Sequence, residues 1–235
     1  MRLLAFETST EACSVAVYVD GEVHERFAVA PRRHAELSLP WAEDVLVEAG
    51  VARSQLDAIA VGRGPGAFTG VRLAIALAQG IALALDRPVV PVSTLAALAL
   101  QAGGERRLAA IDARMGEVYL GTFARTADGL VALSEEVVVK PDAAELPAGD
   151  GWHGVGTGFD AANGALRLRL QGRLAAVDAA ALPHAADVAR LAAPVFAAGG
   201  GIAPERAEPA YLRNDVALTL AQQRALRGEA PPRQP

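Results

Sequence analysis

Residues 3–7, Leu-Leu-Ala-Phe-Glu, and residues 108–112, Leu-Ala-Ala-Ile-Asp, are short apolar runs that each end in an acid. Each run precedes a second strand-like stretch, an Asp-Gly dipeptide and a third strand-like stretch, and the order recurs at an offset of about 105 residues. Asp-Gly pairs are typical of tight hairpin turns, so each set predicts a three-strand meander. The repeat therefore predicts two similar βββα-type halves that face each other across a cleft, with Glu7 and Asp112 at equivalent strand ends.

Strands alternate with helices through the first half of the chain. This order predicts an α/β protein with mixed sheets flanked by helices. Ser93 is expected to cap one of the helices and Thr69 another. The expected strands are 2–8, 12–19, 22–29, 57–62 and 89–92, and the expected helices are 34–49, 70–85 and 94–102.

The second half has a weaker pattern after its own meander. We expect strands at 108–112, 116–124 and 130–140, weaker strands at 152–159, 164–170 and 173–177, a helix at 183–198, and an extended piece with a short helix within 209–220. The predicted domains are residues 1–103, the N-terminal half, and residues 104–227, a reduced C-terminal half that can return a segment to the first. Residues 228–235, with three prolines, are expected to form a disordered tail.

Composition limits the classes of function. The chain has 235 residues, 52% of them hydrophobic, and 27 acids against 22 Lys and Arg give a net charge of −5. This charge disfavours nucleic acid as a sole partner. The single cysteine, Cys13, excludes an internal disulfide and a multi-thiolate metal site. The longest apolar run, 71–85, is shorter than the roughly 20 residues of a membrane span, and the N-terminal run is too short for a signal peptide. We expect a cytoplasmic protein without a membrane partner.

No catalytic or metal site follows from the histidines or from nucleophile motifs. The four histidines have no pair at i, i+3 or i, i+4 spacing, so the sequence predicts no bound metal. No G-x-S-x-G motif marks a nucleophilic serine. A Ser-His-Asp site could still be assembled in space from residues that are far apart in the sequence.

Two loops could contact a phosphate. The loop after residue 7 offers Thr8 and Ser9, and the glycine loop with Gly64 and Gly66 precedes a helix whose N-terminal N–H groups could bind an anion. Glu7 and Glu11 crowd the hydroxyls, which favours a structural role for the first loop. The glycine loop lacks the lysine that follows the last glycine of a P-loop, and both a tight turn and a binding role stay open for it. The candidate nucleotide or phosphate contacts are Thr8, Ser9, Gly64, Gly66, Asp112 and Arg114.

The helix expected at 70–85 has small residues on two sides. Gly70, Ala74, Ala78 and Ala82 form one row, and Ala76, Gly80 and Ala84 form another on nearly the opposite side. A helix that is apolar all round must be covered on more than one side, either by the protein's own core or by a partner. The sequence predicts a dimer when the chain is alone, with the candidate interface His34, Leu37, Trp41, Val45, Val71, Ala74, Ile75, Ala78 and Ala82.

Five motifs together resemble the bacterial TsaB family, also called YeaZ. They are ETSTEACSVA (7–16), AVGRGPGAFTGVR (60–72), VSTLAAL (92–98), DARMGEVY (112–119) and YLRN (211–214). The resemblance implies a duplicated actin-like (ASKHA) fold. It also implies a subunit needed to make N6-threonylcarbamoyladenosine at position 37 of tRNAs that read codons beginning with A.

In the family's system the related TsaD subunit carries the metal and transfers threonylcarbamoyl, the TsaB-like subunit binds TsaD, and TsaE is an accessory ATPase. The resemblance thus implies a heterodimer with TsaD, an indirect link to TsaE, tRNA contact only through the complex, and ATP or ADP at the complex interface. The TsaD relatives have a His-x-x-x-His metal motif where this chain has VSTLAA (92–97), and Glu7 stands where the family usually has Asp. The resemblance therefore implies a non-catalytic scaffold, with no catalytic residue and no intrinsic cofactor of its own.

Two alternatives from other classes remain. One is an ATP-dependent small-molecule kinase of the same fold, in which Glu7 and Asp112 would serve the phosphates and the glycines at 199–201 an adenine ring. A helix end explains those glycines more simply. The other alternative is a protease that acts on the partner subunit.

Overall fold

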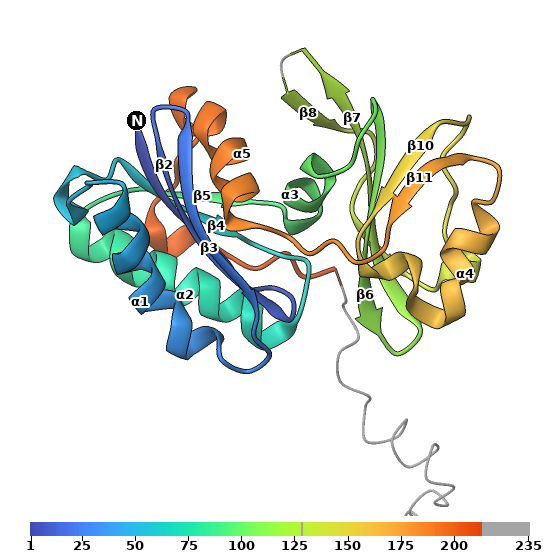
Figure 1. Cartoon of the computed structure of the whole chain (residues 1–235), viewed down its shortest axis with the longest axis horizontal. Coiled ribbons are helices and arrows are strands. Elements are labelled where there is room, and N and C mark those ends of the chain that lie inside the picture. The colour runs from blue at the N-terminus through green and yellow to red at the C-terminus, as the bar shows by residue number, and fades with distance from the viewer. Residues whose placement is uncertain (128, 213–235) are drawn as a thin grey trace, which may run out of the picture.

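The computed structural model describes residues 1–127 and 129–212, which form two lobes side by side (Figure 1). The lobes are joined through a middle region that contains the short helix α3. Elements of the first repeat are β1 (Arg2–Glu7), β2 (Ala12–Val19), β3 (Glu22–Val29), α1 (His34–Glu48), β4 (Ala58–Gly62), α2 (Phe68–Leu85), β5 (Val89–Val92) and α3 (Thr94–Leu100). Elements of the second are β6 (Arg106–Arg114), β7 (Glu117–Thr126), β8 (Gly129–Ala132), β9 (Val137–Val139), β10 (Trp152–Val155), α4 (Ala161–Arg169), β11 (Leu174–Asp178) and α5 (Ala185–Ala197).

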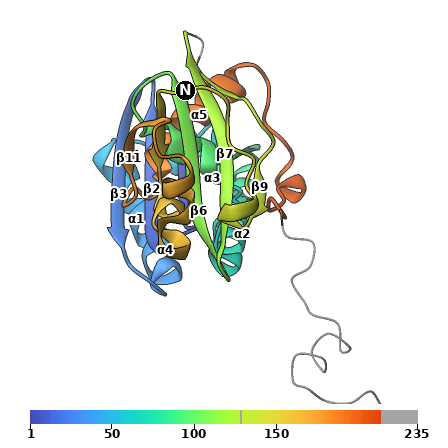
Figure 2. The same cartoon turned by 90° about the vertical axis from the view of Figure 1, so that its right-hand side faces the viewer.

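The two sheets share the same order of five strands, and the second adds a sixth, β9, which pairs with β7. The first has the order β3-β2-β1-β4-β5, with an antiparallel β1-β2-β3 meander and β4 and β5 parallel to β1. Read from its other edge, the second has the order β8-β7-β6-β10-β11, again a meander followed by two parallel strands. Figure 2 shows the second sheet in front of the first. The internal duplication is confirmed, and with it the mixed α/β fold class.

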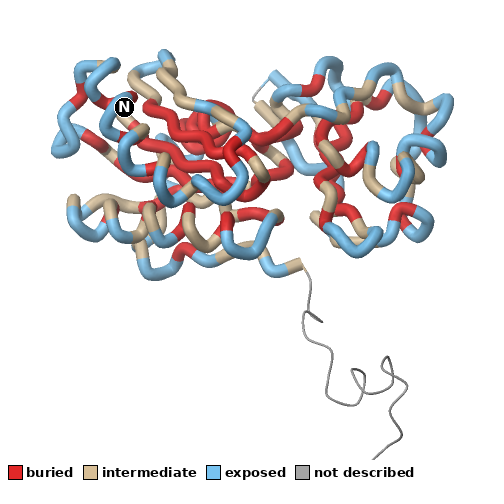
Figure 3. The backbone as a smooth tube through the Cα atoms, turned by 60° about the horizontal axis from the view of Figure 1, so that its bottom comes forward, coloured by how far each residue is buried: buried red, intermediate tan, exposed pale blue. Residues whose placement is uncertain are grey.

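Side-chain alternation along β1 separates the two cores of the first lobe. Leu4 and Phe6 face α1 and α2, whereas Leu3 and Ala5 face α5. Successive strand residues point to opposite faces of a sheet, so a central strand covered on both faces is apolar throughout. Figure 3 shows the central strands of this sheet as buried, whereas the edge strand β3 is partly exposed.

The last helix of each repeat packs on the other lobe. Leu95 and Leu98 of α3 join Ile111 and Phe123 in a core on the second sheet, whose opposite face is covered by α4. Helix α5 comes from the second repeat but packs on the first sheet through alanines such as Ala189. The lobes are therefore tied by two crossing helices. The domain division at residues 103 and 104 stays a prediction.

Several element predictions need correction. Helix α2 begins at Phe68 with Ala67 as its N-cap, so Thr69 lies inside the helix and is exposed. The expected strand at 164–170 is a helix, because Leu166 and Leu170, four residues apart, are buried while Leu168 is exposed. The expected strand at 130–140 is two short strands, β8 and β9.

Part of the prediction falls outside the described residues. This holds for Asp128 of the second Asp-Gly turn, for the short helix expected after Leu212, and for the tail at 228–235. In contrast, Ser93 caps α3 as expected, since its Oγ accepts a hydrogen bond from the N–H of Ala96 at 3.0 Å.

Helix α2 is apolar and long enough to cross a membrane by length and composition, with a mean hydropathy of 1.7. One side of the same helix packs in the core of the first lobe, where Ala74, Ala78 and Ala82 have no exposed surface. Core helices of this kind pass the same test, so the finding is weak evidence for a membrane segment.

Candidate functional site

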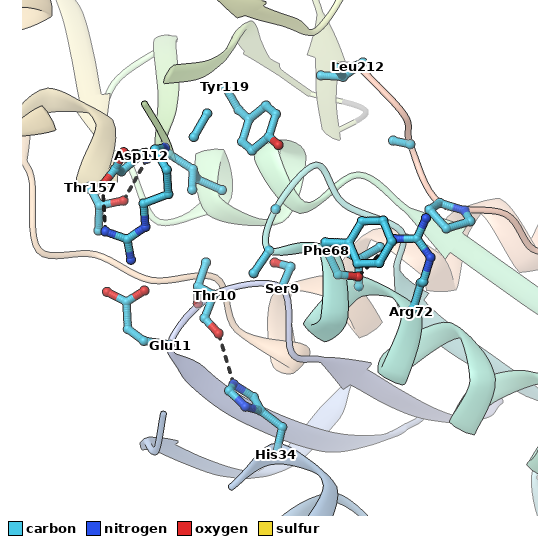
Figure 4. A pocket seen from close by; sticks show the side chains of 18 of the residues that line it. Ser9, Thr10, Glu11, His34, Phe68, Arg72, Asp112, Tyr119, Thr157 and Leu212 are labelled. Atoms are coloured by element: carbon cyan, nitrogen blue, oxygen red, sulfur yellow. Dashed lines mark hydrogen bonds and ion pairs between the residues drawn. The ribbon is translucent and has the colours of Figure 1, made fainter. Parts of the chain in front are cut away.

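A cavity of about 490 Å³ opens between the two lobes (Figure 4). Its lower wall comes from the β1–β2 loop and the N-terminal end of α2, and its upper wall from the end of β6 and from Tyr119 and Thr157. The cavity brings together some predicted phosphate contacts from both repeats. Those that line it are Ser9, Gly66, Asp112 and Arg114.

Thr8 and Gly64 are not among the lining residues. The Thr8 hydroxyl donates to the carbonyl of Gly70 at 2.7 Å, and the N–H of Ala67 donates to the carbonyl of Ser9 at 2.7 Å. A Cβ on Gly70 would lie 1.9 Å from the Thr8 carbonyl oxygen. The glycine loop and the hydroxyl loop are therefore in direct backbone contact. This close approach leaves no room for a larger side chain at Gly70, so the need for glycine does not require a bound ligand.

Glu7 lies beneath this junction rather than in the cavity. It is 1% exposed, and its carboxylate accepts hydrogen bonds from the N–H of Ser9 at 2.7 Å and from the Thr94 hydroxyl at 2.9 Å. Burial raises the pKa of Glu7 above its ordinary value, although these hydrogen bonds oppose the shift. These hydrogen bonds tie the carboxylate to the loop and to α3, and Glu7 does not line the cavity.

Asp112 lies on the opposite wall of the cavity and pairs with Arg114. Its carboxylate accepts from the N–H of Arg114 at 2.7 Å and from the Arg114 guanidinium at 3.1 Å (Figure 4). Glu11 adds a second carboxylate to the lining. Across from them, Ser9 Oγ is buried and has no hydrogen-bond partner within the described residues. A phosphate role for these residues stays a proposal.

Two side chains within residues 92–97 make structural hydrogen bonds. Ser93 caps α3 and also donates to Glu136, while Thr94 donates to Glu7. Within residues 1–127 and 129–212 no group of three or more His, Cys, Asp or Glu side chains could hold a metal ion.

Most of the predicted interface residues are in the wrong place for a partner. Val45, Val71, Ala74, Ile75, Ala78 and Ala82 are buried in the core between α1, α2 and the first sheet. The row beginning at Gly70 faces the protein's own sheet because the sheet supplies the larger apolar surface. As interface positions these six are corrected. His34, Leu37 and Trp41 are half-buried, and His34 Nε2 contacts the carbonyl of Thr10 at 3.0 Å.

The other row of α2 is the one that faces solvent. Ala76, Gly80 and Ala84 are exposed, and Leu83 is 62% exposed. Half-buried Leu73 and Leu77 lie beside them on α2. Helix α1 also has two exposed apolar side chains, Leu39 and Val47. We call the set Leu73, Ala76, Leu77, Gly80, Leu83 and Ala84 the α2 docking face.

Sequence reasoning missed a cluster at the N-terminal end of α2. Arg72 lies with its guanidinium carbon 3.3 Å from the centre of the Phe68 ring and 5.0 Å from that of Tyr211, and it donates to the Tyr211 hydroxyl at 2.6 Å. Phe68 and Arg72 are four residues apart in one helix, a spacing that could have indicated their contact. Tyr211 is 139 residues away from Arg72 along the chain, and no local pattern pairs them.

Two lobes with the same sheet order, crossed by exchanged helices around a central cleft, define a duplicated actin-like protein. Its sequence matches the family model described as TsaD, tRNA N6-adenosine threonylcarbamoyltransferase, over residues 17–217. The tRNA threonylcarbamoyladenosine biosynthesis protein TsaB of Escherichia coli is 44% identical, over 92% of this chain and 96% of the relative. Its namesake from Haemophilus influenzae is 38% identical, over 92% and 95%.

Solved structures agree with these relatives. YeaZ from Pseudomonas aeruginosa is 48% identical, covers 90% of this chain and 99% of its own, and superposes with a TM-score of 0.84. A second Pseudomonas aeruginosa structure, an uncharacterized protein with similarity to peptidase YEAZ, has 47% identity, the same coverage and a TM-score of 0.83. The chain belongs to the TsaB (YeaZ) family.

Proposed function

We propose that this chain is a non-catalytic subunit in the synthesis of tRNA N6-threonylcarbamoyladenosine, and that it binds and activates a TsaD-family subunit. The names of its relatives support the pathway. The match to the TsaD family model supports a partner of related fold. The proposal includes a cytoplasmic location, an indirect link to TsaE, tRNA contact through the complex, and a homodimer when the partner is absent.

The observation that carries the proposal is the α2 docking face. Its six residues are all apolar or glycine: Ala76, Gly80, Leu83 and Ala84 are exposed, whereas Leu73 and Leu77 are half-buried at its border and Leu77 also packs against the core. Contiguous exposed apolar surface on a soluble protein marks an interaction site. Small residues such as Ala76 and Gly80 would let a partner helix approach closely, since close helix packing requires short side chains at the contact.

The hydrogen bonds of the two candidate acids, Glu7 and Asp112, support a chain without a catalytic role. Glu7 is buried and bonded to its own loop, and Asp112 is paired with Arg114. A kinase needs carboxylates free to hold Mg²⁺ and to accept a proton from the substrate hydroxyl. ATP or ADP between the lobes at the complex interface would instead use the cavity's Ser9, Gly66 and Arg114.

The test replaces one residue on each side of the same helix. Ala76→Glu puts a charge on the docking face, and we expect it to fold normally, to lose the TsaD-family subunit in co-purification, and to abolish the modified nucleoside in tRNA from cells that lack the native gene. Ala78→Glu is the matched change on the buried side, and we expect it to unfold because it buries an unpaired charge.

Normal modification by an Ala76→Glu variant that no longer binds the partner would contradict the scaffold role. The conservative variants Glu7→Gln and Asp112→Asn separate the alternatives. If both fold and both lose the modification with partner binding intact, chemistry in this chain becomes the better explanation. A protease acting on the partner would be detected as cleavage of the TsaD-family subunit in the mixture.

A further inference from the structure

The chain after α5 forms a strap along one flank of α2. The strap is residues 202–212. It begins where Ile202 pairs with Val89 of β5, and it is held in the middle by the side-chain amide of Gln79, which donates to the carbonyls of Pro204 and Ala207 at 3.0 and 3.2 Å. Near its end the N–H of Ala210 donates to the carbonyl of Arg63 at 2.8 Å.

The strap ends beside Arg72. Tyr211 and Phe68 are exposed by 57% and 62%, and the Arg72 guanidinium lies between their rings (Figure 4 shows Phe68 and Arg72). Arg72 Nη1 donates to the Phe68 carbonyl at 3.2 Å and Nη2 to the Tyr211 hydroxyl at 2.6 Å. A guanidinium has five N–H donors, so these two bonds fix its position and leave capacity for a carboxylate.

Arg72 is also the only charged side chain in α2. Residues 72, 76, 79 and 83 lie on adjoining parts of the helix surface at 100° per residue. Arg72 and Gln79 thus mark the strap-side border of the docking face, and Arg72 forms no ion pair within residues 1–127 and 129–212.

We propose that Arg72, positioned by Phe68 and the strap residue Tyr211, forms an ion pair with an acidic side chain of the TsaD-family subunit and sets the orientation of that subunit on α2. This rests on the proposed function. An apolar face alone fixes orientation poorly because hydrophobic attraction is not directional, whereas a charge pair at an interface fixes register. A single cation on one border makes the face asymmetric.

The clamp also makes Arg72 a strong anchor. Arginine and tyrosine are enriched among residues that dominate binding energy. A long side chain held between two rings loses little conformational freedom on binding, so the entropic cost of association is smaller. Removing it would leave the partner's carboxylate without its cation at the interface.

The experiment measures the dissociation constant of the full chain with the purified TsaD-family subunit of the same organism by calorimetry, at several salt concentrations. We expect Arg72→Met, which keeps the length of the side chain, to weaken binding about tenfold or more and to reduce the dependence on salt. Arg72→Lys should lie between, because it keeps the charge but not the fork. Arg167→Met on α4 is the control and should bind as the parent does.

Ala76→Glu separates the two proposals. If Ala76→Glu blocks binding while Arg72→Met binds with the parent's affinity and salt dependence, the ion pair is wrong and the docking face stands. Weakened binding of Arg72→Met with unchanged salt dependence would also overturn the ion pair, because Arg72 would then act only through packing. If Ala76→Glu binds normally, the docking face itself is wrong.

Discussion

His184 Nδ1 lies 3.0 Å from Glu25 Oε2 and joins the start of α5 to strand β3 of the first lobe. The other oxygen of Glu25 accepts from the N–H of Ala186 at 3.0 Å and from the Ser14 hydroxyl at 2.7 Å. The His184 ring also stacks on Phe27 with centroids 4.0 Å apart. These contacts cap the exchanged helix where it returns from the second repeat.

This contact should make the free energy of unfolding depend on pH in two ranges, an alkaline one set by His184 and an acidic one set by Glu25. The hydrogen bond to Glu25 raises the pKa of His184, so its contribution is complete below the ordinary histidine pKa and is lost as pH rises through the raised value. For Glu25 burial alone would raise the pKa, but the hydrogen bonds from His184 and Ser14 lower it. Its contribution is present above the ordinary carboxyl pKa and is lost as pH falls through the lowered value.

We therefore expect His184→Gln to cost about 1 kcal/mol near pH 6 and less near pH 9, measured by urea unfolding at both values. Glu25→Gln should remove most of this pH dependence. An equal loss for His184→Gln at both pH values would show that the ring contributes by stacking alone.

The pKa of Glu7 is shifted in the opposite direction from that of Glu25, so its effect on stability has the opposite dependence on pH. Its pKa is raised by burial, so the folded state holds the proton more tightly, and stability falls as pH rises above the ordinary carboxyl pKa. Glu7→Gln should fold, since its amide oxygen can accept from the Ser9 N–H and its NH2 group can donate to the Thr94 hydroxyl oxygen. It should gain stability relative to the parent more at pH 8 than at pH 4.5. Unfolding free energies at the two pH values check this, and a larger gain at pH 4.5 would contradict it.

Two glycines of α2 should respond oppositely to the same change. Gly70→Ala places a methyl 1.9 Å from the Thr8 carbonyl oxygen, and we expect a loss of about 1–3 kcal/mol from overpacking. Gly80→Ala meets nothing within 4 Å and should stabilise the helix by about 0.5–1 kcal/mol. Thermal unfolding of both variants beside the parent tests the packing of the two loops.

The isolated chain should bind ATP weakly and hydrolyse it negligibly. The Thr8 hydroxyl donates to the Gly70 carbonyl, and no lysine follows that glycine. Arg114, an arginine of the cavity lining, is paired with Asp112. Calorimetry and a phosphate-release assay check this. A low-micromolar dissociation constant with turnover near ~1 s⁻¹, the low end of kinases, would favour the kinase alternative.

Elemental analysis of the isolated chain should likewise find less than one metal ion per chain.

Without a partner the chain should self-associate through the docking face. Light scattering at high micromolar concentration should give a dimer for the parent and a monomer for Ala76→Glu, because a charge at a closely packed apolar contact has no counterion there. A monodisperse parent monomer would contradict this prediction.

The sequence by itself determined the two meanders, the alternation of strands and helices, and the duplication, because period-2 runs and Asp-Gly turns are local signals. The resemblance in five motifs led to the family. Local signals failed at 164–170, where alternating leucines fit a strand and an i, i+4 helix equally until the burial of Leu166 and Leu170 decided between them.

Only the tertiary structure decided which face of α2 is free, because the row containing Ala78 and the row containing Ala76 are both small and apolar, and the position of the sheet alone distinguishes them. The exchange of α3 and α5 between lobes and the pairs Arg72 with Tyr211 and Glu25 with His184 join residues up to 159 positions apart. The periodicity of apolar residues in the sequence does not predict such contacts, since they depend on how the assembled sheets place the chain in space.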